Sequence, residues 1–329
     1  MKVVILSSVH HPLDTRIFYK EAQTLAHAGY QVVLIAPHTS KEEVISGVRI
    51  IGLPRARSRW RRPLLWGRVL WRALRERGDV YHFHDPELLP IGVLLQWLSH
   101  KPVIYDAHEW YPGKILLRSW LPKLLRPLVR TLFATVEPLL ARQLAATITA
   151  DHLTAEWLQK HKVPEPVILY NYPLRDIYPS PPSRNYGAHG PNLLFIGTVG
   201  TDRGIFEMLD TVAKLLALGI IAHLYVIGPI KTPHLRKSIR EHIQRTGVDE
   251  FVHFEGFIPQ DKLFPYLKMA HLGLVISKPE IYALNIPTKM FEYMAAGLPV
   301  IATRAEMTSY FLEPTGAGVL VDSLDPQDY

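Results

Sequence analysis

The segment that decides the fold is N-I-P-T-K-M-F-E-Y-M-A-A-G-L-P-V-I, residues 285–301. It predicts a loop, a short helix and a buried strand. Pro287 fits the first helical turn, where a missing N–H costs nothing, and Gly297 fits the residue after the helix end. The free N–H groups and positive dipole of the helix start can hold a phosphate, and Lys289 adds a full positive charge. Glu292 lies one turn further along and can accept hydrogen bonds from two ribose hydroxyls, so the segment predicts a nucleotide-sugar site.

The rest of the second half alternates short apolar runs with segments of helical periodicity. Strands are predicted at 193–197, 222–227, 252–256, 272–276, 300–303 and 318–321, and helices at 205–218, 233–246, 260–269 and 287–296. Such alternation predicts a doubly wound parallel sheet, in which ligands bind outside the carboxyl ends of the strands.

The first half alternates in the same way. Strands are predicted at 3–6, 31–36, 48–53, 80–84, 103–106 and 146–149, and helices at 17–28, 61–75, 90–98 and 121–144. Between the halves, residues 171–191 are rich in proline, serine and glycine and predict a linker. The predicted fold class is therefore α/β, with two doubly wound, Rossmann-like parallel-sheet domains at 1–170 and 192–329 that face each other across a cleft.

Composition narrows the class of protein. Of 329 residues, 48% are hydrophobic and 20% are charged, which predicts packed cores and excludes global disorder. The absence of cysteine excludes disulfides and thiolate metal sites and is compatible with a reducing cytoplasm. The apolar run at 1–8 is too short for a signal peptide. The sequence contains no run of about 20 apolar residues, so no transmembrane helix is predicted.

The string P-x-K-x-x-E-Y-M-A-A-G-x-P-V-I at 287–301 resembles the donor-binding signature of retaining GT-B glycosyltransferases of family 4, the large bacterial group that makes surface polysaccharides. The resemblance covers nearly the whole chain. It implies a hexosyltransferase that moves a sugar from a nucleotide-diphosphate donor to a glycan or lipid-linked acceptor with retention of configuration. The donor is a substrate, so no cofactor is implied. A cytoplasmic location, peripheral on the inner face of the membrane, is implied as well.

A second donor-binding segment is predicted at F-I-G-T-V-G-T-D-R-G, residues 195–204, between a strand and a helix. Gly197 and Gly200 let the backbone approach a phosphate at the helix start. Arg203 can hold the diphosphate and neutralise the leaving group. Thr198 stands where the resembling family often has a basic residue, so one phosphate contact is expected to be missing or to come from elsewhere.

The resemblance also assigns the loop before the signature helix to the donor sugar. Residues 277–286 are expected to approach the sugar, with Asn285 and Thr288 as donor contacts. The family has a carboxylate pair, and its earlier member falls at Leu284 in this sequence. Glu292 therefore keeps its ribose role, while the handling of the sugar hydroxyls stays open.

In the first half, V-I-Y-D-A-H-E-W-Y-P at 103–112 resembles the D-x-H-E segment of the same family. His108 is expected at the carboxyl end of the sheet, where it can bond the donor sugar or the reacting oxygens. Asp106 and Glu109 are expected to orient it or to line the cleft. Three residues are predicted to be catalytic: His108, Arg203 and Lys289.

Two further loops are assigned to the acceptor side. In H-F-H-D-P-E the side chains of His82 and His84 share one face of a strand, but spacing places no third metal ligand, so packing or cleft lining is favoured. The loop that ends in D-T-R resembles the family's D-x-R segment. Asp14 and Arg16 are expected either to touch the acceptor or donor, or to cap the helix that follows.

No metal is predicted for the donor. Glycosyltransferases of the other major fold hold a divalent metal with Asp-x-Asp, and this string is absent from the chain. The diphosphate charge would be met by Arg203, Lys289 and helix dipoles.

The net charge of +7 is concentrated in a basic segment at 55–77. On a helix, Arg61, Arg68, Arg72 and Arg75 fall within an arc of about 60°. They either face an anionic membrane or form a solvated charged face, and the leucine-rich basic segment at 116–144 is similar. Nucleic-acid binding is the weakest interpretation, since no recognition motif accompanies the charge.

Two other functions stay open. A sugar-nucleotide epimerase has a similar architecture and would turn over a UDP-sugar without an acceptor. A degenerate binding subunit would explain Leu284 and Thr198. The resembling family continues beyond residue 329 with helices that return to the first domain, so a C-terminal truncation is expected. The sequence indicates no oligomeric state.

Overall fold

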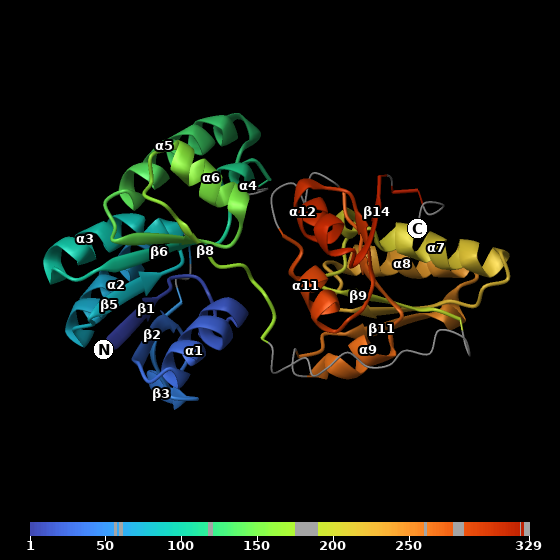
Figure 1. Cartoon of the computed structure of the whole chain (residues 1–329), viewed down its shortest axis with the longest axis horizontal. Coiled ribbons are helices and arrows are strands. Elements are labelled where there is room, and N and C mark those ends of the chain that lie inside the picture. The colour runs from blue at the N-terminus through green and yellow to red at the C-terminus, as the bar shows by residue number, and fades with distance from the viewer. Residues whose placement is uncertain are drawn as a thin grey trace. The chain divides into compact units, whose positions relative to one another are not determined.

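The computed structural model describes residues 1–55, 58, 62–117, 121–174, 190–259, 262–278, 286–322 and 324–325. The chain divides into two compact units, Met1–Asn171 (unit 1) and Tyr172–Tyr329 (unit 2), coloured blue to green and yellow-green to red in Figure 1. Each unit contains one sheet with helices packed against it. The predicted fold class, α/β with two doubly wound parallel sheets, is confirmed. Most of the predicted linker lies outside the described residues.

The sheet of unit 1 has the strand order β3-β4-β2-β1-β5-β6-β7-β8 in the described part of the chain. The strands are β1 (Lys2–Leu6), β2 (Gln31–Pro37), β3 (Glu42–Ile45), β4 (Val48–Leu53), β5 (Val80–Phe83), β6 (Val103–Ala107), β7 (Ala146–Thr149) and β8 (Val167–Ile168). Neighbours pair in parallel except for β3 with β4. Central strands such as β1 are apolar on both faces because helices cover both sides.

The helices of unit 1 bury alternate residues of these strands. They are α1 (Gln23–His27), α2 (Arg62–Glu76), α3 (Leu89–Ser99), α4 (Tyr111–Leu117), α5 (Arg126–Ala141) and α6 (His152–Lys160), with short 3₁₀ turns at Pro86–Leu88 and Lys123–Leu125. Val4 and Leu6 of β1 pack in the core formed with α2, α3 and α5. Val3 and Ile5 face the opposite side, and Figure 1 shows α1 and α3 on opposite faces of this sheet.

The predicted helix at 17–28 begins as a π-helix, η1 (Thr15–Ala22), before it continues as α1. The Asp14 carboxylate caps it by accepting hydrogen bonds from the N–H groups of Arg16 and Ile17. Residues five apart share a face in a π-helix, and the Arg16 guanidinium accordingly lies 3.0 Å from the Glu21 carboxylate. π segments are rare in proteins, and those that occur are often found at functional sites.

Unit 2 has a fully parallel sheet of order β11-β10-β9-β12-β13-β14 in its described residues. Its strands are β9 (Asn192–Ile196), β10 (His223–Ile227), β11 (Val252–Gly256), β12 (Leu272–Val275), β13 (Val300–Thr303) and β14 (Gly318–Val321). Its helices are α7 (Ile205–Ala217), α8 (Pro233–Thr246), α9 (Phe264–Met269), α11 (Thr288–Ala295) and α12 (Glu306–Thr315), with 3₁₀ turns at η6 (Thr201–Arg203) and η7 (Asp249–Phe251). The core is built mainly from β9, β10, α7 and α8.

Several elements differ from the predictions at their ends or were not predicted. The predicted helix at 121–144 is interrupted and becomes a 3₁₀ turn followed by α5. The strands β3 and β8 were missed because they are short edge strands without a buried apolar run. The helices α4, α6 and α12 were also missed, and Pro314 inside α12 is a residue that argues against a helix.

Each sheet has one point where the chain reverses the direction in which it adds strands. In unit 1 this switch point lies between β1 and β5, and in unit 2 it lies between β9 and β12. Loops that follow the two strands diverge there and leave a crevice at the carboxyl edge of the sheet. The loops after β1, β5, β9 and β12 are therefore the places where ligand-binding side chains are expected.

Two glycines inside helices should respond oppositely to alanine. A Cβ on Gly92 of α3 would lie 2.4 Å from Cε1 of Phe83, whose ring is fully buried and stacked on Tyr105. A Cβ on Gly67 of α2 would meet nothing within 4 Å. We expect Gly92→Ala to cost about 1–3 kcal/mol of unfolding free energy and Gly67→Ala to add about 0.5–1 kcal/mol. Urea unfolding measures both, and a stabilised Gly92→Ala protein would contradict this packing.

Candidate functional site

The loop after β9 passes close to the end of β10. The Gly197 N–H donates to the Ile227 carbonyl at 2.8 Å, and Gly197 has φ +133°, which L side chains rarely adopt. The chain then forms η6, which ends in Arg203, and enters α7. Gly200 is buried and Thr198 is half-buried in this loop. The predicted strand, glycine-rich loop and helix are thus present, with a 3₁₀ turn inserted before the helix.

Two cationic side chains converge beside Gly197. A Cβ built on Gly197 would lie 3.5 Å from Arg203 Nη1 and 3.6 Å from Lys289 Nζ. Lys289 is only 7% exposed, and its Nζ lies 3.5 Å from the centroid of the Phe195 ring. Within the described residues, neither Lys289 Nζ nor the buried Arg203 Nε has a hydrogen-bond partner. Arg203 follows β9 and Lys289 follows β12, so the pair flanks the switch point of unit 2.

The electrostatics of this pair are unfavourable without an anion. Burial and the neighbouring Arg203 guanidinium lower the pKa of Lys289 well below its usual range, while Glu292 acts in the opposite direction. Glu292 is half-buried one turn along α11 from Lys289. A buried ammonium beside a guanidinium is costly unless a negative charge compensates it. The pair is therefore suited to binding an anion such as a diphosphate.

The helix α11 is fixed to the end of β9 by a buried tyrosine. The Tyr293 hydroxyl accepts a hydrogen bond from the Ile196 N–H at 2.9 Å and donates one to the Leu194 carbonyl at 3.1 Å. Its ring lies over Gly273 of β12, where an added Cβ would come within 2.4 Å. These contacts set the position of Lys289 relative to the loop after β9.

The start of α11 differs slightly from the prediction. Pro287 is the N-cap residue with extended ψ, and the helix begins at the exposed Thr288. Gly297 follows the helix with φ +62°, as predicted. Asn285 and Leu284 lie outside the described residues, so the structure gives no position for the predicted sugar contact or for the altered carboxylate.

In unit 1, four ionisable side chains converge in the interior. His82 and His84 lie on the same face of the sheet, with ring centroids 4.5 Å apart, and Asp106 of β6 lies on that face beside them. Glu21 reaches them from η1, with Oε2 3.3 Å from His84 Nε2. Possible ligand atoms of these four residues all lie within 4.8 Å of one another. Sequence spacing placed the two histidines together but could not place Glu21.

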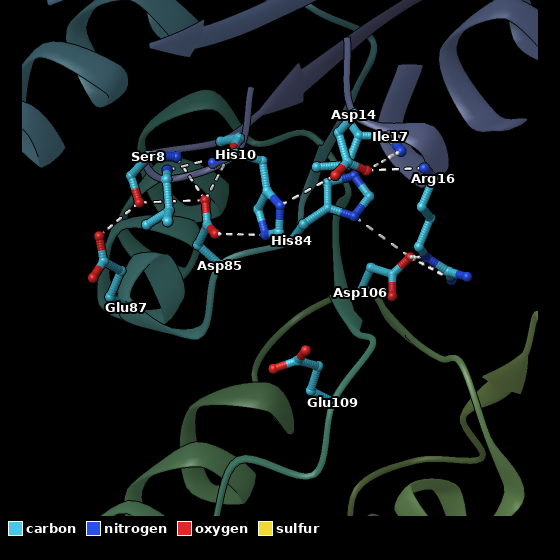
Figure 2. A network of polar contacts seen from close by, with 12 residues as sticks. Ser8, His10, Asp14, Arg16, Ile17, His84, Asp85, Glu87, Asp106 and Glu109 are labelled. Carbon is cyan, nitrogen blue, oxygen red and sulfur yellow. Dashed lines mark hydrogen bonds and ion pairs between the residues drawn. The ribbon is translucent and has the colours of Figure 1, made fainter. Parts of the chain in front are cut away.

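Arg16 pairs with Asp106 of this buried cluster, as Figure 2 shows. Its guanidinium donates to Asp106 Oδ2 at 3.0 and 2.7 Å. It also donates to the Leu169 carbonyl and to Asn171 Oδ1, both at 2.9 Å. Arg16 is 8% exposed, while His84 and Asp106 are fully buried. Of the alternatives predicted for His84, packing or cleft lining, its burial fits packing, and a direct contact of Arg16 or Asp106 with a ligand stays a prediction.

The charges in the cluster are strongly coupled. Burial alone would raise the pKa of Asp106, but the neighbouring His84 imidazole and the Arg16 guanidinium hold it far below its usual range. Burial raises the pKa of Glu21 to about 8 and lowers that of His82 to about 3. Burial would lower the pKa of His84 too, but Glu21 and Asp106 raise it.

A second polar network lies at the switch point of unit 1, between the loops after β1 and β5. Asp85 Oδ2 accepts hydrogen bonds from the Ser7 hydroxyl at 2.9 Å and the Ser8 N–H at 2.6 Å. His10 bridges two carboxylates, with Nε2 3.4 Å from Asp85 and Nδ1 3.5 Å from Asp14. Figure 2 shows the network from close by. His10 and Asp85 were not predicted, although both follow strands that flank the switch point.

In this network the pKa of a carboxyl group is lowered and the pKa of a neighbouring histidine is raised. Burial alone would raise the pKa of Asp14, but hydrogen bonds from His10 and from the backbone lower it to about 2. Burial would lower the pKa of His10, but Asp14 and Asp85 raise it. The arrangement favours a carboxylate and an imidazolium at the edge of the sheet.

His108 lies beside His10 in the loop after β6. The two rings are in edge contact with centroids 5.3 Å apart, and the His84 ring lies 6.1 Å from His108. Burial lowers the pKa of His108, Asp106 opposes this, and His84 and His10 add to it. Its Nδ1 has no hydrogen-bond partner in the described part of the chain. Glu109 is paired with Lys114 and acts on the pKa of His108 through its charge.

The basic face of α2 is present as predicted. Arg68 and Arg75 are exposed and Arg72 is half-buried, while Val69 and the other apolar side chains pack into the core. The guanidinium groups of Arg72 and Arg75 lie 5.2 and 4.7 Å from the ring centroid of Trp71. Arg61 lies outside the described residues.

A second surface of unit 1 is unusually apolar. Exposed side chains follow the 3₁₀ turn before α5 and one stripe of that helix: Leu124, Leu125, Leu128, Leu132, Val136 and Leu139. Leu125 also lines a cavity of about 890 Å³, whose other walls include Trp66, Ile115, Val129 and Phe133. Among the described residues, no helix is long and apolar enough to cross a membrane.

Comparison with protein families matches both units. Residues 15–171 match the family described as Glycosyltransferase Family 4, and residues 190–329 match the family described as Glycosyl transferases group 1. Together the two matches span the chain except for residues 1–14 and 172–189. Glucosyltransferase 3 of Streptococcus gordonii is 35% identical over 117 residues, which is 31% of this chain and only 35% of that protein.

Two solved structures share the fold over nearly the whole chain. Anabaena HepE in complex with UDP and glucose has a TM-score of 0.70 and 16% identity, covering 100% of this chain and 87% of that chain. WaaG, a glycosyltransferase involved in lipopolysaccharide biosynthesis, has a TM-score of 0.69 and 17% identity, covering 99% and 87%. Each unit thus matches a glycosyltransferase family, and the chain has the GT-B fold of these structures.

Proposed function

We propose that the protein transfers a hexosyl group, glucose in the first instance, from a nucleoside diphosphate to a glycan or lipid-linked acceptor with retention of configuration. The observation that carries the proposal is the convergence of Arg203 and Lys289 beside Gly197. Two cations at a switch point, one of them buried and lacking a hydrogen-bond partner among the described residues, fit a diphosphate. HepE was solved with UDP and glucose, and the Streptococcus relative is named a glucosyltransferase, which supports a UDP-glucose donor.

The proposed reaction uses the same cations to stabilise the leaving group. As the bond from the sugar to the diphosphate breaks, Arg203, Lys289 and the start of α11 stabilise the negative charge that develops on the diphosphate. The acceptor hydroxyl attacks from the face that the diphosphate leaves and passes its proton to an oxygen of the departing diphosphate, and the configuration is retained. His108 is proposed to bond the sugar, and Glu292 the ribose hydroxyls. Charge from protein cations makes a metal ion unnecessary at the diphosphate.

The acceptor is proposed to be lipid-linked and to belong to the synthesis of a bacterial surface polysaccharide. The apolar cavity beside α5 has room for part of a hydrocarbon chain, and Leu125 joins it to the exposed leucines. These leucines and the arginines of α2 suit peripheral binding to an anionic membrane on its cytoplasmic face. The participation of WaaG in lipopolysaccharide synthesis supports a product of this class.

Loss of either cation should weaken donor binding. We expect Lys289→Met and Arg203→Met each to lower UDP affinity by about tenfold to a hundredfold, because a hydrogen bond to a charged group contributes about 1.5–3 kcal/mol. Lys289→Met should also raise the melting temperature of the free protein, since it removes a buried cation without a hydrogen-bond partner among the described residues. Calorimetric titration with UDP and a thermal melt without ligand measure the two effects.

Lys231→Met is the matched control for these variants. Lys231 follows β10 and is already paired with Asp202 at 2.7 Å, so its loss should leave UDP affinity unchanged. An unchanged affinity in Lys289→Met, or an equal loss in Lys231→Met, would count against the proposed diphosphate site.

Incubation with UDP-, GDP- and ADP-sugars distinguishes a transferase from an epimerase and from a binding subunit. An epimerase converts the donor without an acceptor, and a binding subunit leaves it intact.

Donor binding should depend on pH through Lys289. The free lysine has a lowered pKa, and a bound diphosphate favours its charged form, so binding takes up a proton once the pH exceeds the free pKa. UDP affinity is therefore expected to be full below that pKa and to fall as the pH rises through it. Titrations between about pH 6 and 9 in buffers of different ionisation enthalpy measure the uptake. The Lys289→Met protein should show none of it, and equal uptake in both proteins would exclude Lys289 as the source.

Membrane binding should depend on the leucines of α5. The double variant Leu128→Glu/Leu132→Glu is expected to reduce partitioning onto vesicles with anionic lipid by about tenfold or more, because each buried leucine contributes about 1.5–3 kcal/mol. Leu218→Glu is the matched control, since Leu218 is equally exposed but lies at the end of α7 in unit 2. Vesicle co-sedimentation measures the partitioning. Equal binding of all three proteins would contradict a role for α5.

A further inference from the structure

The buried cluster of unit 1 has a feature that the proposed transfer reaction does not use. His82 Nε2, both ring nitrogens of His84 and both oxygens of Glu21 are buried and have no hydrogen-bond partner within the described residues. Buried polar atoms are normally satisfied, so unsatisfied atoms that converge require an explanation. We propose that Glu21, His82 and His84 bind one divalent transition-metal ion, Zn²⁺ in the first instance, as a structural centre of unit 1.

The spacing of the atoms fits metal coordination better than hydrogen bonding. Glu21 Oε2 lies 3.3 Å from His84 Nε2 and 3.9 Å from His82 Nδ1. A charge-assisted hydrogen bond would bring such atoms to about 2.7–2.9 Å. Ligand atoms around tetrahedral zinc, each bonded at about 2.0–2.1 Å, lie about 3.3 Å from one another. The separation of Glu21 from His84 matches this spacing, and its separation from His82 is somewhat longer.

Asp106 occupies the position of a supporting carboxylate. The second nitrogen of each histidine faces Asp106 Oδ2, at 3.5 Å from His84 Nδ1 and 3.9 Å from His82 Nε2. Metal-bound histidines commonly donate their other N–H to a carboxylate, which fixes the tautomer and the orientation of the ring. Arg16 neutralises Asp106 from the opposite side, with its guanidinium 2.7 Å from Oδ2. Asp106 is therefore a positioning residue in this centre.

The charge balance is compatible with a cation. Metal coordination requires a deprotonated Glu21, whose pKa is about 8 in the free protein, and Glu21, Asp106 and Arg16 then leave one negative charge in the protein interior. A bound cation supplies the charge and uses the nitrogen lone pairs. Imidazole ligands favour zinc and its neighbours over magnesium or calcium.

The fold explains why the sequence alone did not indicate this centre. His82 lies in β5 and His84 directly after it, the supporting carboxylate comes from β6, and the third ligand comes from a π-helix about sixty residues earlier in the chain. The π winding turns Glu21 inward together with Arg16. The centre lies in the interior of unit 1 and is separate from the proposed diphosphate site of unit 2. It is expected to stabilise unit 1 rather than to act on the donor.

The test is metal binding by the full chain, carried on an affinity tag without histidine. Protein stripped with a chelator is equilibrated with Zn²⁺, and the bound metal is counted by mass spectrometry. We expect about one tightly bound Zn²⁺ per chain, a higher melting temperature with zinc than without, and visible absorption bands when Co²⁺ replaces it. The variant His82→Gln/His84→Gln should lose the bound metal and the shift in melting temperature.

The matched control is His223→Gln/His253→Gln, which removes another histidine pair, 3.1 Å apart on neighbouring strands of unit 2. It should keep about one Zn²⁺ per chain. Failure of the wild-type chain to bind zinc, or loss of zinc with the control pair alone, would overturn the proposal. If the His82/His84 variant does not fold, X-ray absorption of the zinc-loaded wild type decides: two imidazoles per zinc support the centre, and none contradicts it.

Discussion

Parallel strand pairing is the constraint on which the charged groups at the two switch points depend. In a parallel sheet the loops that follow the strands all lie at the same edge. Where the strand order reverses, the loops of two neighbouring strands turn away from each other, and side chains from both can face the space between them. In unit 2 the reversal lies between β9 and β12 and brings Arg203 and Lys289 together. In unit 1 it lies between β1 and β5 and brings His10 beside Asp85. The charged side chains are far apart in sequence and meet because of strand order.

The buried Arg16 of unit 1 and the buried Lys289 of unit 2 have opposite electrostatic surroundings. In unit 1, Arg16 is matched by Asp106 and Glu21, and its remaining hydrogen bonds hold the end of the unit at Leu169 and Asn171. In unit 2, Lys289 lies beside another cation and loses basicity as a result. Stability alone would not select such a lysine, because burying a cation beside another is costly. An anionic ligand gives it a role, which is why this pair carries the functional conclusion.

Much of the fold could be read from the sequence because each half repeats strand and helix with clear punctuation. The helix around Lys289 was placed to within a residue, with Gly297 at its end and Pro287 as its cap instead of its first residue. What could not be read were contacts between distant segments. The burial of Arg16 follows from Asp106, ninety positions away, and Glu21 of the π-helix after Asp14 lies beside His84, more than sixty positions away. Local patterns carry no signal for either.

The central claim is that unit 2 binds the nucleoside diphosphate of a sugar donor between the loops after β9 and β12. A crystal structure of the protein with UDP tests it most directly. We expect phosphate oxygens within about 2.7–2.9 Å of Lys289 Nζ and of the Arg203 guanidinium, beside Gly197. UDP bound with its phosphates on other residues, and with Lys289 still without an anionic partner, would contradict it.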